Sequence, residues 1–401
     1  MNSIKTKELQ KLLFSHSSFI FGRKVLMIFI NIYIWKLTDD ISAVAIFNII
    51  FFIIHSFSFA FFAKYVKEGK ANLIKNLGLF FLIIFYFILF LLKENAVNHL
   101  IILPIFWGII NAMYWVAYHT QNFDHTHTRN RANYTATERS VRTFVNLTAP
   151  IVGGFLITFD PFGLGYGNIF LLGMLFQSIA LFTGSIPEKT QASKDYHPIK
   201  SFRYIWSFSD QRKTLLSNSL ASIGYTRGLD KILTIFLFII LGTELEVGFW
   251  ISIFSIFSII ATLFVGKYIE YNQYKKIALL SSLFLSGSIL NIVIFPGFLS
   301  YIILGSVTQM ADPLIGLARR ISALNILHKD GFQEKHRVEF MVIREFFNVA
   351  IGGSISLLPL IFFKELNVLN IVPVIILMSL ATLTQGFLIN SIKTDLIKYN
   401  F

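Results

Sequence analysis

Apolar residues follow one another along this chain in long runs, and short polar segments separate the runs. With a window of about 19 residues, about twelve runs reach the length that crosses the hydrocarbon core of a bilayer. Backbone amides and carbonyls in lipid must be paired within their own segment, so each run is predicted to form an α-helix. We place these helices at residues 15–36, 41–63, 73–92, 99–120, 138–158, 166–185, 213–241, 246–267, 275–295, 299–325, 339–363 and 368–390.

The composition agrees with a chain that lies mostly in lipid. Hydrophobic residues make up 55% of the 401 residues, charged residues only 14%, and the mean hydropathy is +0.65. A water-soluble domain has about 25% charged residues, so a cytosolic enzyme and a disordered chain are both disfavoured. The chain contains no cysteine, which excludes disulfides and thiolate metal sites. No nucleotide-binding or hydrolase motif occurs, so we expect neither an enzyme nor a cofactor.

The net charge of +13 is explained by the orientation of the chain in the membrane. If the N-terminus is cytoplasmic, about 28 of the lysines and arginines lie in cytoplasmic segments. Only Lys36, Lys93 and Lys364 then lie on the outer side. Because cytoplasmic loops carry the excess of basic residues, both termini are predicted to be cytoplasmic, and nucleic acid is not expected as a partner.

The second half of the sequence repeats features of the first half. At a nearly constant separation, residues 24–29 resemble 231–236, residues 63–67 resemble 266–270, and residues 142–146 resemble 344–348. We therefore expect an N-terminal six-helix bundle over 1–186, a cytoplasmic linker over 187–212 and a C-terminal six-helix bundle over 213–401. Two such bundles enclose a cavity near the bilayer midplane.

With these features the chain resembles the major facilitator superfamily over essentially its whole length. Residues 265–270 are similar to the family's loop motif, whereas Ala63 and Lys67 replace its glycine and its acid in the first half. Residues Pro150–Gly154 are similar to the end of the family's antiporter motif. The resemblance implies a twelve-helix carrier that works by alternating access, with every third helix facing lipid. The predicted sixth and twelfth helices carry no charge within them, and the third and ninth carry lysines only within their first three residues, Lys75, Lys275 and Lys276.

Charged residues inside the predicted first and seventh helices are the main candidates for substrate binding. They are Arg23, Lys24, Arg227, Asp230 and Lys231. A charge at the bilayer centre costs about 3 kcal/mol, so these residues must face water or partners. Arg227 and Lys231 share a helix face at i,i+4 spacing, and the repeat places Lys24 opposite Lys231.

These cations have three interpretations that the sequence leaves open. They clamp an anionic group of the substrate, as basic residues on the same two helices do in the superfamily's organophosphate antiporters. Alternatively they form a structural cluster with Asp230, Asp312 or Glu345 as counter-ions. In the third interpretation, Arg23 and Lys24 reach the cytoplasmic interface.

The predicted fourth helix carries an aromatic and polar stripe. Its members at i,i+4 spacing are Trp107, Asn111, Trp115 and His119. Facing the cavity, Asn111, Trp115 and His119 would contact the substrate; alternatively the tryptophans lie at the membrane interface and Asn111 bonds a neighbouring helix.

Ion coupling and gating have weaker candidates. Asp312, at a polar helix break before Pro313, and His55 are the candidates for proton binding, although a single membrane histidine is more often a helix-to-helix hydrogen bond. Charged residues at the cytoplasmic ends of helices in both halves predict an inner gate, or simple interfacial anchoring. They are Glu138, Arg142, Lys267, Glu270, Glu339, Arg344 and Glu345. Residues 119–127 contain three histidines, but their spacing is not that of a zinc site, so we expect a solvated loop and no metal.

We therefore expect a gradient-driven transporter in the plasma or inner membrane, acting as a monomer on a small organic solute, preferably an anion. Protons or a counter-substrate would drive it. A multidrug-type efflux antiporter is one alternative, favoured by the many phenylalanines and the partial antiporter motif. A receptor or scaffold that keeps the fold without transport is the other.

Overall fold

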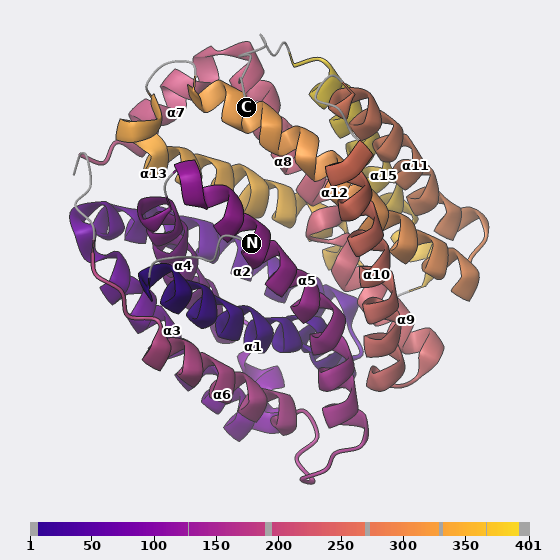
Figure 1. Ribbon diagram of the computed structural model, residues 1–401. Helices are drawn as coiled ribbons and strands as arrows, with labels where there is room; N and C mark the ends of the chain where they lie inside the picture. Colours follow the sequence, from indigo (N-terminus) through magenta and orange to yellow (C-terminus); the bar gives the residue numbers. More distant parts are fainter. Residues whose placement is uncertain are drawn as a thin grey trace. The chain divides into compact units, whose positions relative to one another are not determined.

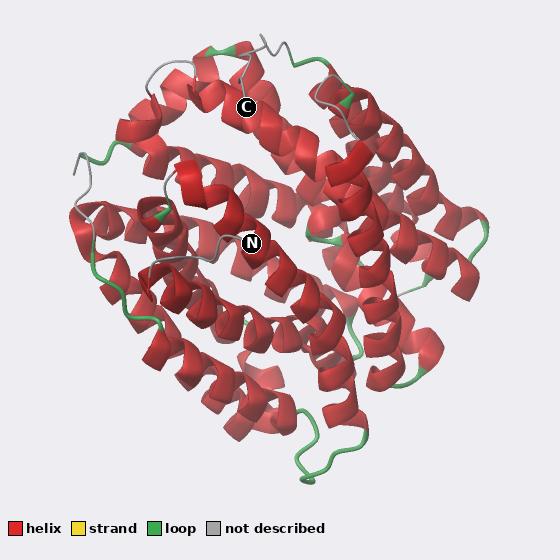
Figure 2. Ribbon diagram, viewed as in Figure 1, coloured by secondary structure: helices red, strands yellow, loops and turns green. Residues whose placement is uncertain are grey.

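The computed structural model describes residues 7–126, 128–188, 195–268, 273–328, 332–365 and 367–392. Throughout these ranges every regular element is a helix (Figure 2). Helices pair their backbone groups internally, which is what an apolar surrounding demands. The α-helices are α1 (Lys7–Thr38), α2 (Ile41–Tyr65), α3 (Ala71–Leu92), α4 (Ile102–His125), α5 (Thr128–Thr158), α6 (Gly167–Thr183), α7 (Pro198–Ser207), α8 (Ser209–Ala221), α9 (Leu229–Leu241), α10 (Glu244–Tyr268), α11 (Tyr274–Ile294), α12 (Phe298–His328), α13 (Phe332–Glu345), α14 (Ser354–Leu357) and α15 (Val368–Asn390) (Figure 1).

Helices occupy the segments in which the sequence predicted them. Within the described residues, eight helical stretches are long and apolar enough to cross a membrane, and α6 is a shorter apolar helix. The protein is therefore a multi-pass membrane protein of helices. Twelve crossings and cytoplasmic termini stay predictions.

Contacts between residues divide the chain into two compact units. The first unit comprises Met1–Asp195 and Thr234–Ser255, and the second comprises Tyr196–Leu233 and Ile256–Phe401. In the first unit α1 packs against α5 and α6, and α4 packs against α2 and α3. In the second unit α11 packs against α12 and α15.

The predicted linker contains a helix that belongs to the second unit. Along α7, an apolar face packs against α13. Buried Ile205 meets Phe340 and Ile343 there, and Phe202 and Trp206 cover the same cluster. The opposite face of this ten-residue helix, with Arg203 and Ser207, is exposed, so α7 is amphipathic.

The first half of α10 lies directly on α5 in the first unit. A Cβ atom at Gly248 would stand 2.2 Å from the carbonyl oxygen of Pro150, and one at Gly154 would stand 2.4 Å from the carbonyl oxygen of Glu244. Glycines at such positions let two helix backbones approach closely in lipid. The glycine that ends the partial antiporter motif thus has a packing role here.

Glu244, the first residue of α10, joins three parts of the first unit. Its Oε1 lies 3.0 Å from Nζ of Lys36 on α1 and accepts a 2.7 Å hydrogen bond from the hydroxyl of Tyr166, next to α6. Glu244 is only 5% exposed. Burial raises the pKa of Tyr166 well above its ordinary value, and the neighbouring Glu244 charge acts in the same direction, so the phenol keeps the proton it donates.

Two helices of the second unit depart from the predicted continuous α-helices. Between α8 and α9, the chain forms a π-helical turn, η3 (Ser222–Thr226), and after α13 it forms a second one, η4 (Phe346–Gly353). The two turns pack together, and the Oγ of Ser222 donates a 2.6 Å hydrogen bond to Oδ1 of Asn348. The predicted single α-helix over 213–241 is therefore wrong, because the π-helical turn η3 and the non-helical backbone of Arg227 separate α8 from α9.

Replacing Gly248 by alanine tests the contact between α5 and α10. The added methyl group collides with a backbone carbonyl, which cannot rotate away, so we expect Gly248→Ala to destabilise the protein by about 1–3 kcal/mol. Gly287 on α11 has nothing within 4 Å of its Cβ position and provides the matched control. Gly287→Ala should be neutral or stabilise by up to about 1 kcal/mol. Thermal unfolding of the detergent-purified variants measures both, and equal midpoints would contradict the packing described here.

Candidate functional site

Arg23 on α1 meets two of the predicted residues of α4. Its Nε donates a 3.1 Å hydrogen bond to Oδ1 of Asn111, and its guanidinium carbon lies 5.4 Å from the ring centroid of Trp115. Asn111 is 1% exposed, and its own amide nitrogen donates to the carbonyl of Trp107, which turns the amide oxygen toward Arg23. The structure thus brings together Arg23, Asn111 and Trp115, which the sequence predicted separately.

His119 extends this arrangement by one helical turn. Its ring lies 5.3 Å from that of Trp115. Arg23, Trp115 and His119 are partly exposed, whereas Asn111 beneath them is buried. The amide of Asn111 and the indole of Trp115 contact the guanidinium, so this face combines a cation with aromatic rings.

Trp107, at the other end of the predicted stripe, belongs to the core. It is 2% exposed, and its ring lies 4.5 Å from that of Phe51 and 5.9 Å from that of Phe85. The stripe on α4 therefore divides into a buried aromatic end and a partly exposed polar end.

A second polar layer beside Arg23 was missed in the sequence. His16 on α1 is 1% exposed, with Nδ1 2.9 Å from the hydroxyl of Tyr114 and Nε2 3.4 Å from Oε1 of Glu138. Its ring stacks on that of Tyr118 at 3.6 Å. His16 lies two turns before Arg23 on the same face of α1, and this spacing could have identified His16 from the sequence.

The predicted gating residues lie in different surroundings. In the first unit, Arg142 forms an ion pair with Glu138 one turn earlier on α5. In the second unit, Glu339 is fully buried and accepts a 3.3 Å hydrogen bond from the backbone of His197, while Arg344 and Glu345 are half-buried at the end of α13.

Two members of the gating set lie at the edge of what the structure describes. Lys267 is in α10, but its side chain lies outside the described residues, and Glu270 lies outside them entirely. A gating role for the whole set stays a prediction.

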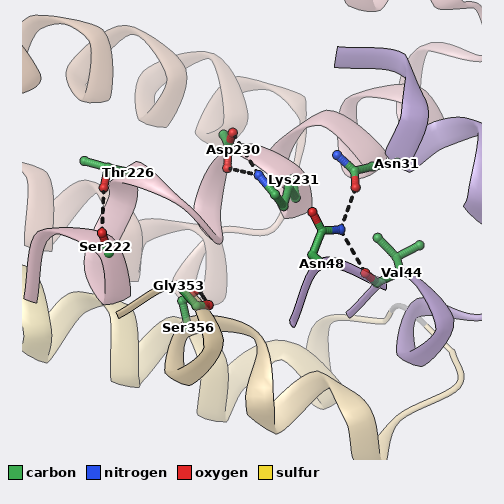
Figure 3. Close-up of polar contacts among 9 residues, drawn as sticks. All are labelled: Asn31, Val44, Asn48, Ser222, Thr226, Asp230, Lys231, Gly353 and Ser356. Carbon is green, nitrogen blue, oxygen red and sulfur yellow. Dashed lines mark hydrogen bonds and ion pairs between the residues drawn. The ribbon is translucent and has the colours of Figure 1, made fainter. Parts of the chain in front are cut away.

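In the second unit, the charges of the predicted seventh helix do not share one helix face. Arg227 has φ −128° and ψ −47° and follows η3, so it precedes the helix on which Lys231 lies. Lys231, 5% exposed, directs its Nζ at both carboxylate oxygens of Asp230, at 3.2 and 3.3 Å (Figure 3). The predicted i,i+4 relation is wrong because the helix is interrupted between them. Lys24 is half-buried on α1, and its approach to Lys231 stays a prediction.

The two predicted proton-binding residues lie in unlike places. Asp312 is 3.8 Å from Nη2 of Arg319 on the same helix, with its side chain 53% exposed. Because α12 continues through Pro313, the predicted helix break is wrong. His55 is buried between the rings of Phe51 and Phe59.

The histidine-rich stretch after His119 is helical instead of forming the predicted loop. Helix α4 continues to His125, which is 5% exposed, with Nδ1 3.4 Å from Oε2 of Glu8 and Nε2 3.2 Å from the carbonyl of Pro187. His127 lies outside the described residues. Among the residues that are described, no group of three His, Asp or Glu is placed to hold a metal ion.

Sequence comparisons give relatives without a stated activity. No family model matches the chain. It is 24% identical over 331 residues to the uncharacterized protein YqgE of Bacillus subtilis (strain 168), covering 82% of this chain and 76% of that protein. It is 25% identical over 143 residues to an uncharacterized protein in the sodM 3' region of Geobacillus stearothermophilus, covering 36% of this chain and 67% of that protein.

Solved structures with a similar fold are membrane transporters. A bacterial homologue of the iron transporter ferroportin, in its inward-facing state, matches with a TM-score of 0.70 at 13% identity, over 97% of this chain and 98% of that chain. The human organic anion transporter MFSD10 (TETRAN) matches with a TM-score of 0.65 at 10% identity, over 97% of this chain and 100% of that chain. A bacterial metal transporter matches with a TM-score of 0.64 at 14% identity, over 96% of this chain and 98% of that chain. At these identities the likeness shows a transporter-like fold, and it shows nothing about the cargo.

The contact between Arg23 and Asn111 can be measured with a double-mutant cycle. We expect Arg23→Met and Asn111→Leu to be coupled by about 1–3 kcal/mol, because each removes the partner of a charge-assisted hydrogen bond in a buried place. The unfolding free energies of the two single variants and the double variant in detergent give this coupling.

Lys36→Met is the control partner for Arg23→Met. Thirteen residues along α1 separate these two side chains by about 20 Å. Their effects should add to within about 0.5 kcal/mol. Equal coupling in the two cycles would mean that Arg23 and Asn111 do not interact.

Proposed function

We propose that this protein is a gradient-driven carrier that moves a small organic anion across the membrane by alternating access. The observation that carries the proposal is the partly exposed guanidinium of Arg23, held by the buried amide of Asn111 and by the ring of Trp115. The transporter-like fold supports transport as the activity. The charge and the aromatic surface of this site support the class of cargo.

The chemistry of the three side chains favours a carboxylate or phosphate on an apolar or aromatic body. A guanidinium is planar and always charged, and it binds both groups through two parallel hydrogen bonds. The rings of Trp115 and His119, 5.3 Å apart on the same helix, offer a flat surface beside the charge. Such a site would bind a purely inorganic anion less well, because the rings would gain no contact.

The proposal includes the architecture of the major facilitator superfamily. In it, twelve helices cross the membrane as two six-helix bundles, with both termini cytoplasmic. The similarity to a human organic anion transporter over nearly the whole of both chains supports this arrangement. Lys24, Arg227 and Lys231 would then supply further positive charge to the pathway, and the charged residues of α5 and α13 would form the inner gate.

Replacing Arg23 by glutamine tests the cargo. We expect small aromatic carboxylates such as benzoate to raise the unfolding temperature of the purified wild-type protein, because a ligand of the folded state stabilises it. Loss of a charge-assisted hydrogen bond of about 1.5–3 kcal/mol should weaken this binding in Arg23→Gln by at least about tenfold. Arg203→Gln, on the exposed face of α7, is the matched control and should bind like wild type.

The other functions give different results in the same assays. Stabilisation by divalent metals or by hydrophobic cations alone, with Arg23→Gln unchanged, would contradict an anion carrier. Stabilisation by benzoate without uptake into proteoliposomes, under any imposed proton gradient, would indicate a receptor instead of a transporter.

A further inference from the structure

The buried pair of His16 and Glu138 lies in the first unit beside the proposed anion site, and the proposed function does not use it. Nε2 of His16 is 3.4 Å from Oε1 of Glu138. The other ring nitrogen, Nδ1, is 2.9 Å from the hydroxyl of Tyr114. In this ring, which is 1% exposed, Nδ1 thus has a hydrogen-bond partner, whereas Nε2 makes no hydrogen bond among the described residues and has the Glu138 carboxylate as a neighbour. A histidine and a carboxylate in contact can share one proton, because each is a natural partner of the other's charged form.

Glu138 connects this buried imidazole to a more exposed cation. The carboxylate oxygen that faces His16 also lies 2.5 Å from Nη2 of Arg142. The exposed fractions of the side chains increase along this row, from 1% for His16 through 13% for Glu138 to 43% for Arg142. The row therefore offers a path along which a proton can enter and leave the interior of the first unit.

The same imidazole contacts the ring that holds Arg23. His16 and Trp115 have their ring centroids 5.6 Å apart in an edge-to-face arrangement, and Arg23 lies over that indole. Seven residues along α1 separate His16 from Arg23, which corresponds to about 10 Å. An anion bound at Arg23 would therefore lie close enough to His16 for its charge to act on the imidazole.

The surroundings of His16 decide when it holds a proton. The groups that face it are mostly neutral phenols and cations, with Glu138 as the acid. From α4 and α5 they are Tyr114, Tyr118, His119, Glu138 and Arg142, with the hydroxyl of Tyr134 next to that of Tyr118. The cation of Arg142 disfavours a charged imidazole, whereas the carboxylate of Glu138 favours it. A bound anion adds a second negative charge and tips this balance toward the protonated form.

We propose that His16 and Glu138 form a proton-binding site whose occupancy is coupled to anion binding at Arg23, so that the anion and one proton bind together. This inference rests on the proposed function. In the step, a proton from solvent forms the N–H bond at Nε2 of His16, which then donates to the Glu138 carboxylate. When the anion leaves, that N–H bond breaks and the proton returns to solvent. Because coupling is reciprocal, the anion must then bind more tightly at low pH.

The first measurement tests the proton site without any anion. A protonated imidazole quenches the fluorescence of an indole that it contacts. The emission of Trp115 is obtained by subtracting the emission of Trp115→Phe from that of the unsubstituted protein. This emission should change in one step between about pH 4 and 8. In His119→Gln, which removes the other imidazole beside Trp115, the step should remain. Adding His16→Gln to that variant should abolish it. In Glu138→Gln the midpoint should move to lower pH by at least about one unit, because the negative neighbour is lost.

The second measurement tests the coupling. Benzoate should raise the midpoint of the step in wild type by about one pH unit, which corresponds to about tenfold tighter binding of benzoate in the protonated state. In Arg23→Gln the step should remain and benzoate should not move it.

The two measurements separate the two proposals. A step that is absent in His119→Gln, or that persists when His16→Gln is added to it, overturns the proton site while leaving the anion carrier intact. A step that benzoate does not move, although benzoate stabilises the protein, overturns the coupling. If benzoate fails to bind wild type at all, the proposed function fails and the coupling with it, while a step that depends on His16 still establishes the proton site.

Discussion

The cost of a charge in an apolar surrounding governs the interior of this protein. In the first unit, charged groups inside the packing are held by a dipole, a ring or an opposite charge, as Arg23 and Glu244 show. Arg23 has the amide of Asn111 and the indole of Trp115, and Glu244 has Lys36 and a phenol. These partners come from different helices, so satisfying the charges also determines how α1, α4, α6 and α10 are placed within the unit.

The two units meet this constraint in different ways. In the first unit, α1 and α5 are continuous, and their polar side chains carry the charge pairs. In the second unit, the corresponding segments are interrupted at η3 and η4, where side-chain hydroxyls and amides take over part of the hydrogen bonding. Interrupted helices concentrate backbone polar groups in the interior, which is tolerated only where protein surrounds them. The interiors of the two units therefore differ in how their helices are built.

The fold and the site answer different questions about this protein. Similar folds occur in an organic anion transporter and in metal transporters, so the fold supports transport without selecting a cargo. Under the proposed function, the cargo would be selected by a few side chains on one face of α1 and α4. That face combines the guanidinium of Arg23 with the rings of Trp115 and His119.

Hydrophobic runs alone determined the helical class and the approximate ends of the membrane helices, because lipid requires every segment to pair its own backbone groups. Polar and aromatic residues inside these runs gave the candidates Arg23, Asn111, Trp115 and His119. Tertiary structure alone decided which of these side chains meet. It interrupted the helix between Arg227 and Lys231, docked α7 on α13, and placed His16 against Glu138, which lies far along the chain. Periodicity tells which residues share a helix face, whereas partners on other helices depend on how those faces pack.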